Sequence, residues 1–411
     1  MLEKKVLIIG LVWPEPTSSA AGTRIIQLID LLLSASYEVT FASAASKGEF
    51  SARLSSNGVS EQDIKLNDQS FNVFLKDLNP AMVVFDRFMT EEQYGWRVQQ
   101  ECPDALRILD TEDLHFLRHA RQQAVKSAAS APLNLYTDLA KREIAAILRC
   151  DLSLMISEIE ISILRETFHI DHTLLYYLPF LEEEIDPLRS KDWKNYDDRE
   201  GFVFIGNFLH EPNWHTLQVL KKEIWPSLRK KLPGVNLHIY GAYASSKVTQ
   251  LHNAKENFLV HGRADDAREA ISGHRVLLAP IQFGAGVKGK FIDAMQTGTP
   301  AVTTTIGAEA MKGDLEWNGD IADDPESLIE RAVLIYQDQS RWLQAQQNGI
   351  EIINTRYGKS RFSAAFISVI EALFLNLTQH RQRNFFGQIL QHHTASSTKY
   401  LSLWIEEKNK H

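Results

Sequence analysis

Glycines and lysines alternate in a short segment of the second half of the chain, residues 284–290. This segment follows an apolar run at residues 275–280 and leads into residues 290–296, whose composition favours a helix. The start of a helix presents free backbone N–H groups and the positive end of the helix dipole, and Lys288 and Lys290 would add their ammonium groups at the same place. The segment therefore predicts an anion site with phosphate as its occupant.

The glycines also match the pattern G-x-G-x-x-G of dinucleotide-binding loops, and the acidic residue Glu309 lies twenty positions after the last glycine. In such folds the loop follows the first strand of its domain. Here strand-like runs at residues 202–205, 235–240 and 258–260 come earlier. The position of the loop therefore favours a phosphate-bearing ligand other than NAD(P). An NAD(P)-dependent oxidoreductase stays open as an alternative.

Composition and charge fit a soluble enzyme. With 411 residues the chain is long enough for two domains that each bury a core. A net charge of −8 disfavours nucleic acid as the partner, because duplex-binding proteins carry a basic excess. Cys102 and Cys150 lack metal-site spacing and suit a reducing compartment. No signal peptide or uninterrupted apolar run of about 18 residues is evident, so we expect a cytoplasmic protein without a membrane span.

Apolar runs alternate with segments of helical periodicity, which indicates an α/β fold with parallel sheets covered by helices. Residues 181–200 interrupt this alternation, since twelve of the twenty are charged, and we interpret them as an interdomain linker. From Asp324 onward we expect helices, and we expect the amphipathic tail at residues 384–410 to pack on the first domain. The expected strands are residues 6–10, 37–42, 81–86, 105–110, 152–157, 174–178, 201–206, 235–241, 257–262, 275–280 and 300–305, with helices beginning near Gly22, Glu91 and Glu158.

Motifs of several other enzyme classes do not occur in the sequence. H-E-x-x-H, G-x-S-x-G and clusters of His and Cys are absent, which argues against a metalloprotease, a serine hydrolase and a zinc protein. Asp-x-Asp is also absent, which argues against metal-dependent sugar transfer on a single Rossmann domain. We therefore expect no metal site and no cofactor.

Seven stretches of the sequence are similar to one known family. They are FVFIGNFLHEPNW at 202–214, IYGAY at 239–243, LLAPIQFGAGVKGKFIDAMQTGTPAVTTTIGAEAM at 277–311, IADDPESL at 321–328, VLIIGLVWPEPTSSAAGTR at 6–24, LDTEDLHFLR at 109–118 and SEIEISIL at 157–164. Together they resemble the family 4 retaining glycosyltransferases, glycosyl transferases group 1, which have the GT-B fold.

This resemblance implies two Rossmann-like domains that face each other across a cleft. Residues 1–180 would bind the acceptor, with C-terminal helices at 358–411 packing back on them, and residues 201–357 would bind a nucleotide-sugar. The implied reaction transfers a sugar, with retention and without metal, to a glycan, lipid-linked or small-molecule acceptor in cell-surface polysaccharide or glycoconjugate synthesis. Peripheral contact with the inner face of the membrane and the oligomeric state stay open.

The sequence departs from the common family pattern in two places. Asn207 and Asn213 stand where many members have an arginine and a lysine that hold the diphosphate. Ala285 and Asp293 stand where many members have two glutamates. Because the first glutamate is missing, a non-catalytic nucleotide-sugar-binding protein stays open as a second alternative.

The resemblance and the anion-site argument together give a set of expected site residues. Fixed positive charge is needed where the diphosphate leaves, and the leaving phosphate oxygen can take the acceptor proton, so a dedicated base is optional. The expected catalytic residues are His115, Lys288 and Lys290; the expected donor-binding residues are Gly206, Asn207, Asn213, Gly241, Arg263, Gly284, Gly286, Val287, Gly289, Asp293 and Glu309; and the expected acceptor-binding residues are Gly22, Thr23 and Arg24.

Overall fold

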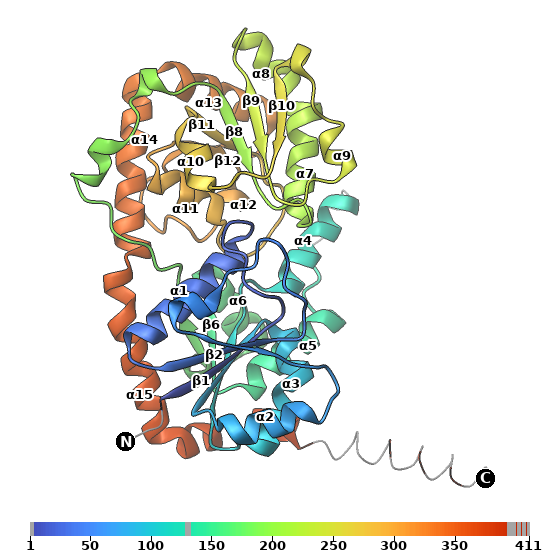
Figure 1. Ribbon diagram of the computed structural model, residues 1–411. Helices are drawn as coiled ribbons and strands as arrows, with labels where there is room; N and C mark the ends of the chain where they lie inside the picture. The colour runs from blue at the N-terminus through green and yellow to red at the C-terminus, as the bar shows by residue number, and fades with distance from the viewer. Residues whose placement is uncertain (1–3, 128–132, 393–399, 401–403, 405–407, 409–411) are drawn as a thin grey trace.

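The computed structural model describes residues 4–127, 133–392, 400, 404 and 408. Two parallel β-sheets with their surrounding helices form two lobes stacked along the long axis of the molecule (Figure 1). We call the lobe of the first sheet domain 1 and the lobe of the second sheet domain 2. The predicted α/β fold with two Rossmann-like sheets is confirmed.

Domain 1 contains seven parallel strands in the order β3-β2-β1-β4-β5-β6-β7. Its central strands are mostly apolar because both faces of the sheet are covered, and Val6, Leu7 and Ile8 of β1 are 0% exposed. The strands are β1 (Lys5–Gly10), β2 (Glu38–Ser43), β3 (Ser60–Asp63), β4 (Met82–Asp86), β5 (Leu106–Asp110), β6 (Leu152–Met155) and β7 (Leu175–Tyr177).

The helices of domain 1 follow the carboxyl ends of these strands, so several of them begin along one edge of the sheet. Serine caps fix two of these starts: Ser19 Oγ accepts the N–H of Gly22 at 3.0 Å, and Ser157 Oγ accepts the N–H of Glu160 at 3.3 Å. The helices are α1 (Ala20–Ser34), α2 (Ser70–Leu78), α3 (Phe88–Glu101), α4 (His115–Ser127), α5 (Asp138–Arg149) and α6 (Glu158–Phe168).

Domain 2 contains six parallel strands in the order β10-β9-β8-β11-β12-β13. Its core includes Phe202, Phe204 and Leu277, all 0% exposed. The strands are β8 (Phe202–Ile205), β9 (Leu237–Tyr240), β10 (Phe258–Gly262), β11 (Val276–Ala279), β12 (Ala301–Thr303) and β13 (Gly319–Ile321). The helices are α7 (Glu211–Val219), α8 (Trp225–Lys231), α9 (Ser246–Thr249), α10 (Ala267–Ser272), α11 (Gly289–Gln296), α12 (Thr305–Ala308), α13 (Pro325–Gln337) and α14 (Gln339–Ile352).

The chain then returns to domain 1 through α15 (Lys359–Arg383) and α16 (Phe385–Gln391). Helices α14 and α15 run along one side of both lobes (Figure 1). Phe366 and Ile370 of α15 are 1% and 0% exposed and belong to the domain 1 core. By length and composition α15 could cross a membrane, and only 11% of the residues in its most apolar window are buried. The expected lack of a membrane span therefore stays a prediction.

Two short strands differ from expectation, whereas the connecting segment joins the two lobes. β3 and β13 were not predicted, because β3 is polar and both lie at sheet edges. Residues 181–200 connect β7 of domain 1 to β8 of domain 2, and most of them are exposed or partly exposed. Arg199 in this segment is 0% exposed and donates to Thr299 Oγ1 at 2.6 Å and to the carbonyl of Thr297 at 2.8 Å. Part of the charge of this segment therefore fixes the connection to domain 2.

Helix α16, at the start of the tail, packs on α5 of domain 1 as expected, but not through its apolar residues. We expected its apolar residues to pack on domain 1, but Phe386 and Ile389 of α16 are 74% and 52% exposed. Polar groups make the contact instead, since Asn384 Nδ2 donates to the carbonyl of Leu148 in α5 at 2.7 Å. Of the remaining tail, Tyr400 and Trp404 are exposed, and residues 393–399, 401–403, 405–407 and 409–411 lie outside the described residues.

Candidate functional site

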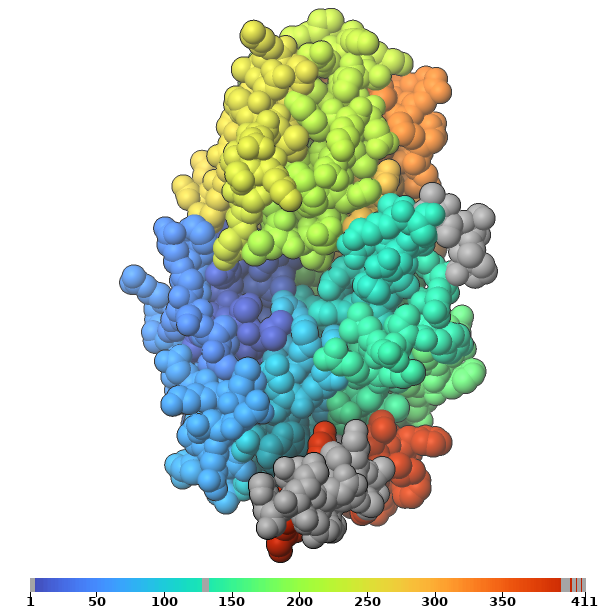
Figure 2. Space-filling model, turned by 90° about the vertical axis from the view of Figure 1, so that its right-hand side faces the viewer, coloured from blue at the N-terminus to red at the C-terminus, as the bar shows by residue number. Residues whose placement is uncertain are grey.

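The carboxyl edges of the two sheets meet between the lobes. Tyr243, which follows β9, donates its hydroxyl to Glu15 Oε2, which follows β1, at 2.6 Å. Helices α1 and α11 both begin in this region, and a Cβ on Gly289 would lie 2.8 Å from the Cβ of Ala20. Two helix N-termini therefore adjoin, each with free N–H groups. Figure 2 shows the surfaces of the two lobes in contact along this boundary.

The glycine loop, residues 284–289, follows β11 and touches domain 1. Gly286 has a φ of +61°, and a Cβ there would lie 2.8 Å from the Cβ of Asp113 and 3.0 Å from Cδ1 of Ile156. This contact and backbone angle both favour glycine. The N–H of Gly286 donates to Glu160 Oε1 of α6 at 2.7 Å. A carboxyl group of domain 1 thus occupies one N–H group of the predicted anion site.

Both predicted lysines lie at this loop. Lys288 Nζ donates to the carbonyl of Gly286 at 2.9 Å, and Lys290 Nζ donates to Asn213 Oδ1 at 2.6 Å. Burial lowers the pKa of Lys288 to about 8, and burial together with the neighbouring Lys288 lowers the pKa of Lys290 to about 7. An entering anion would favour the charged form of both side chains.

The two asparagines at the predicted donor site are connected to each other. Asn213 Nδ2 donates to the carbonyl of Asn207 at 2.9 Å, while its Oδ1 accepts from Lys290. Gly206 permits this arrangement, because a Cβ there would lie 2.7 Å from Cγ of Asn213. Gly241 has a similar role, since a Cβ there would lie 2.1 Å from the carbonyl oxygen of Gly206. Asn213 therefore orients the ammonium group of Lys290. It adds no positive charge of its own to the predicted donor site.

His115 is the first residue of α4 and lies in domain 1 near the glycine loop. Its Nε2 is 3.5 Å from Asp113 Oδ1, and its ring packs edge-on against Phe88. Burial lowers the pKa of His115 to about 4, although Asp113 opposes the shift. His210 of domain 2 has a pKa of about 4 for the same reason and interacts electrostatically with Asp113 and Lys290. Both imidazoles are therefore neutral at pH 7.

Sequence reasoning missed two residues of domain 1 that contact the glycine loop. Arg121 of α4 donates to the carbonyl of Gly284 at 2.8 Å and to Glu309 at 2.6 and 2.7 Å. Glu160 is the second, and burial raises its pKa to about 8. The sequence spacing could have indicated Arg121 as a site residue. His115, Arg118 and Arg121 are spaced three residues apart and so share one face of a helix.

The predicted acceptor residues Gly22, Thr23 and Arg24 lie in the first turns of α1, and the prediction of a helix beginning near Gly22 is confirmed. A Cβ on Gly22 would lie 2.5 Å from the carbonyl oxygen of Glu15, so this glycine allows the preceding loop to pack on the helix. Thr23 Oγ1 donates to a carbonyl of the same loop at 3.1 Å. Arg24 is 3% exposed and pairs with Asp110 at 2.9 Å. These contacts stabilise domain 1, and contact with an acceptor stays a prediction.

Three predicted donor-site residues have other partners. Asp293 Oδ1 accepts from Arg268 Nε at 2.8 Å, so its carboxylate turns towards α10. Val287 is 8% exposed and belongs to the domain 2 core. Arg263 Nη2 donates to Thr17 Oγ1 of domain 1 at 2.7 Å. Arg263 therefore joins the two lobes, and contact of Asp293 with a donor stays a prediction.

Buried carboxyl groups gather at the ends of β4 and β5. Asp86, Asp110 and Glu112 are 2%, 0% and 8% exposed. Oδ1 of Asp86 and Oε1 of Glu112 have no hydrogen-bond partner among the described residues. Burial, reinforced by Asp110, raises the pKa of Glu112 to about 8. These oxygens could accept hydrogen bonds from the hydroxyl groups of a ligand.

Residues 199–338 match the family model glycosyl transferases group 1. This range contains the glycine loop, both lysines and both asparagines. A curated relative from Klebsiella pneumoniae, described as an uncharacterized 44.6 kDa protein in the cps region, is 27% identical over 173 residues. That alignment covers 40% of this chain, and the chain spans 44% of the length of the relative.

Solved glycosyltransferase structures have the same fold. A sucrose-phosphate synthase from Thermosynechococcus elongatus superposes with a TM-score of 0.65 at 13% identity, covering 90% of this chain and 99% of the other. HepE from Anabaena, solved in complex with UDP and glucose, gives a TM-score of 0.64 at 13% identity and covers 90% and 100%. The architecture of this chain is therefore GT-B, as the sequence resemblance implied.

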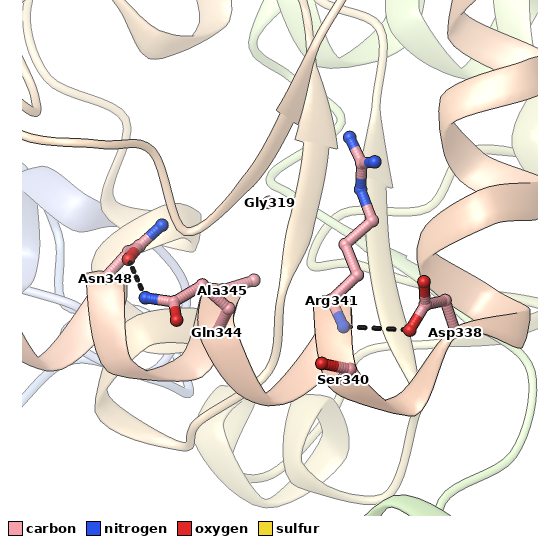
Figure 3. Close-up of a pocket in the computed structure, with 7 residues that line it drawn as sticks. All are labelled: Gly319, Asp338, Ser340, Arg341, Gln344, Ala345 and Asn348. Carbon is pink, nitrogen blue, oxygen red and sulfur yellow. Dashed lines mark hydrogen bonds between the residues drawn. The ribbon is translucent and has the colours of Figure 1, made fainter.

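A separate pocket lies on domain 2 between β13 and α14 (Figure 3). Asp338 and Arg341 line one part of it, with the backbone N–H of Arg341 donating to Asp338 Oδ1 at 3.0 Å. Gln344 and Asn348 line another part and bond to each other at 3.0 Å. No residue of the glycine loop lines this pocket, so it is distinct from the candidate site.

Among the described residues, no group of three or more His, Cys, Asp or Glu could hold a metal ion.

Proposed function

We propose that this protein is a glycosyltransferase that moves a sugar from a nucleotide-sugar to a hydroxyl group of an acceptor. One observation carries the proposal: the glycine loop and its two lysines lie at the start of α11, opposite domain 1, in a segment that matches the glycosyl transferases group 1 model. Backbone N–H groups, a helix N-terminus and ammonium groups are suited to a diphosphate. The fold adds a second Rossmann-like sheet for the other substrate.

In the proposed reaction the bond between the anomeric carbon and the diphosphate oxygen breaks, and negative charge grows on the diphosphate. Lys288 and Lys290 would stabilise that charge. The acceptor oxygen bonds to the anomeric carbon, and its proton passes to the leaving phosphate oxygen. This route needs no dedicated base and gives retention of configuration when the acceptor attacks from the side of the leaving group.

The remaining roles follow from the positions of the residues. Neutral His115 would accept or donate one hydrogen bond with the donor sugar without adding charge. Asp86 and Glu112 at the edge of domain 1 would accept hydrogen bonds from acceptor hydroxyls. A sugar-bearing acceptor, free or lipid-linked, and a place in cell-surface polysaccharide or glycoconjugate synthesis belong to this proposal, as does activity without metal.

The first test is ligand binding. We expect a thermal-shift screen of UDP-, GDP- and ADP-sugars to find at least one stabilising donor, since a ligand at about 100 times its Kd adds roughly 2.7 kcal/mol of stability. UDP-sugars come first, because HepE was solved with UDP and with UDP-glucose. Stabilisation by NAD(P) and by no nucleotide-sugar would support an oxidoreductase instead. Binding with no release of nucleoside diphosphate to any acceptor or to water would support a non-catalytic binding protein.

The second test concerns metal. We expect turnover of metal-stripped protein to be unchanged in excess EDTA, because lysines and a helix N-terminus supply the positive charge. Loss of turnover that Mg²⁺ or Mn²⁺ restores would contradict the proposed roles of Lys288 and Lys290.

A further inference from the structure

One arginine of domain 1 connects two loops of domain 2. Arg121 donates both terminal nitrogens to the carboxylate of Glu309, at 2.6 and 2.7 Å, in the two-point geometry that makes such pairs strong. It also donates to the carbonyl of Gly284 at 2.8 Å. Gly284 follows β11 and Glu309 follows β12 and α12. A single guanidinium thus holds the glycine loop against the neighbouring loop.

The ion pair is largely enclosed. The side chains of Arg121 and Glu309 are 12% and 14% exposed. Lys288 interacts electrostatically with both residues of the ion pair. Burial is the main cause of its lowered pKa; the charge of Arg121 lowers this pKa further, and the charge of Glu309 opposes the shift. Charges that interact in a partly buried place are screened less by water and salt than surface charges. A change at Arg121 is therefore expected to alter the charge around the predicted phosphate site.

A second side chain of domain 1, that of Glu160, also contacts the glycine loop of domain 2. Glu160 of α6 accepts the N–H of Gly286 at 2.7 Å and the N–H of Leu114, near the start of α4, at 3.2 Å. The carboxyl group thereby ties the glycine loop to the segment that leads into α4. Arg121 and Glu160 contact the loop from two different helices, so the shape of the loop depends on the position of domain 1 relative to domain 2.

We propose that Arg121 is a positioning residue of the donor site: through Glu309 and the Gly284 carbonyl it holds the glycine loop in its binding shape, and it thereby couples closure of the two domains to donor binding. This inference rests on the proposed function for its substrate, and it names a residue outside the segment that matches the family model. The donor site is then complete only when domain 1 is closed on domain 2.

The coupling follows from what Arg121 contacts in each state. In the closed state it neutralises Glu309 beside Lys288, whereas in an open state Glu309 would face Lys288 alone and the glycine loop would lose one of its supports. A diphosphate therefore binds better to the closed state, and by linkage its binding favours closure.

A charge exchange between the two residues tests this inference. Dyes on Ser55→Cys of domain 1 and Lys247→Cys of domain 2, both exposed positions, would report the distance between the lobes by energy transfer. Cys102 and Cys150 are buried and are not expected to take dye. The variants are Arg121→Glu, Glu309→Arg and their combination, with circular dichroism as the check on folding.

The matched control is Arg142→Ala. Arg142 pairs with Glu92 at 2.6 Å on the exposed surface of domain 1, so this variant removes an arginine ion pair that does not cross between the lobes. We expect it to leave the distance between the lobes and the Kd of UDP unchanged.

We expect each single charge reversal to lower energy transfer without ligand, to weaken UDP binding by about tenfold and to raise the donor KM more than it lowers kcat. The combined variant should restore the distance between the lobes and most of the affinity. The inference is overturned if the single variants keep the wild-type distance and Kd, or if the combined variant restores the distance but not the Kd, since Arg121 would then contact the diphosphate itself. If the wild type bound no nucleotide, the proposed function would fail, while rescue of the distance by the combined variant would still support the positioning of domain 1 by this pair.

Discussion

The lysines of the glycine loop have pKa values that fall within the pH range of ordinary assays. Burial lowers the pKa of Lys290 to about 7 and that of Lys288 to about 8. Glu160 at the same loop has a pKa raised to about 8 by burial. A bound diphosphate favours the protonated form of all three groups, because it is an anion. Ligand binding and proton binding are therefore linked at this site.

This linkage predicts a pH dependence of nucleotide affinity. At pH 6 the lysines of the free protein are largely charged and Glu160 is neutral, so binding of UDP is strongest. As pH rises through about 7 to 8, binding must take up protons, and the Kd of UDP is expected to rise by up to about tenfold per pH unit for each group that titrates. Calorimetry in two buffers of different ionisation enthalpy would measure this uptake at pH 8. Tighter binding at pH 8.5 than at pH 6.5 would contradict the assignment.

Removing either lysine should affect the chemical step. Lys288→Ala or Lys290→Ala is expected to lower kcat by about 10²-fold for the lysine that faces the leaving phosphate, with the far-UV spectrum unchanged. Lys247→Ala, on the exposed surface of domain 2, is the matched control and should keep wild-type turnover. Turnover near the wild-type level in both single variants and in the double variant would remove the basis for the phosphate site.

His115 should act on the sugar and not on the diphosphate. It lies in domain 1 against Phe88, and it is neutral because burial lowers its pKa to about 4. His115→Ala is therefore expected to lower kcat while the Kd of free UDP, measured by calorimetry, stays within about twofold of the wild type. If the variant lost UDP binding but kept the kcat of the wild type at saturating donor, the proposed role would be wrong.

The sequence predicted one part of this site better than the other. Lys288, Lys290 and Asn213 could be placed because they lie close to one loop and to motifs that resemble a family. Arg121 and Glu160 could not, because they reach the loop only when two distant parts of the chain come together. Their contacts depend on the closed arrangement of the lobes, which local spacing does not encode. The ion pair of Asp293 with Arg268 was also missed, because it joins two helices within domain 2, α10 and α11, whose packing local spacing does not encode.

At the scale of elements, the close approach of α1 and α11 brings two helix starts together. A Cβ on Gly289 would lie 2.8 Å from the Cβ of Ala20, which is closer than two such atoms can pack. The glycine at this position therefore permits the contact between the lobes, in addition to its place in the G-x-G-x-x-G pattern.

This contact predicts a rescue between two positions. Gly289→Ala should push α11 away from α1, lower energy transfer between dyes at positions 55 and 247 and reduce turnover by about tenfold, a cost in line with small displacements of positioning groups. Adding Ala20→Gly removes the clashing Cβ and should restore most of the turnover. Ala20→Gly alone serves as the control for the loss of helix propensity. No recovery in the double variant would show that Gly289 acts through its backbone alone.

The buried strands were predictable because a covered parallel sheet favours continuous apolar runs, and β1, β4, β8 and β11 have them. β3 and β13 were not predictable on this basis, since β3 (Ser-Glu-Gln-Asp) has no apolar residue and β13 (Gly-Asp-Ile) has only one. In the tail, the amphipathic spacing predicted the helix α16 correctly. It did not predict which face of this helix would contact domain 1, and its apolar residues Phe386 and Ile389 face solvent.

At the scale of the whole molecule, the two lobes are held together by contacts from several elements. Arg268 of α10 joins Asp293 to Glu182 of the connecting segment, at 2.8 and 2.7 Å. The ion pair of Arg121 with Glu309 links α4 of domain 1 to the loop after α12 of domain 2. Closure of the lobes would bring the glycine loop and His115 to the same substrate, so the proposed sugar transfer would use both sheets.

The central claim is that the glycine loop holds the diphosphate of a nucleotide-sugar during transfer. The most direct measurement is release of nucleoside diphosphate from a panel of UDP-, GDP- and ADP-sugars, with water and simple glycosides as acceptors, by the wild type and by the Lys288→Ala, Lys290→Ala double variant. The wild type should release diphosphate from one class of donor, and the double variant should be slower by at least about 10²-fold while it keeps its fold. Equal release by both proteins, or stabilisation of the wild type by NAD(P) in place of every nucleotide-sugar, would contradict the claim.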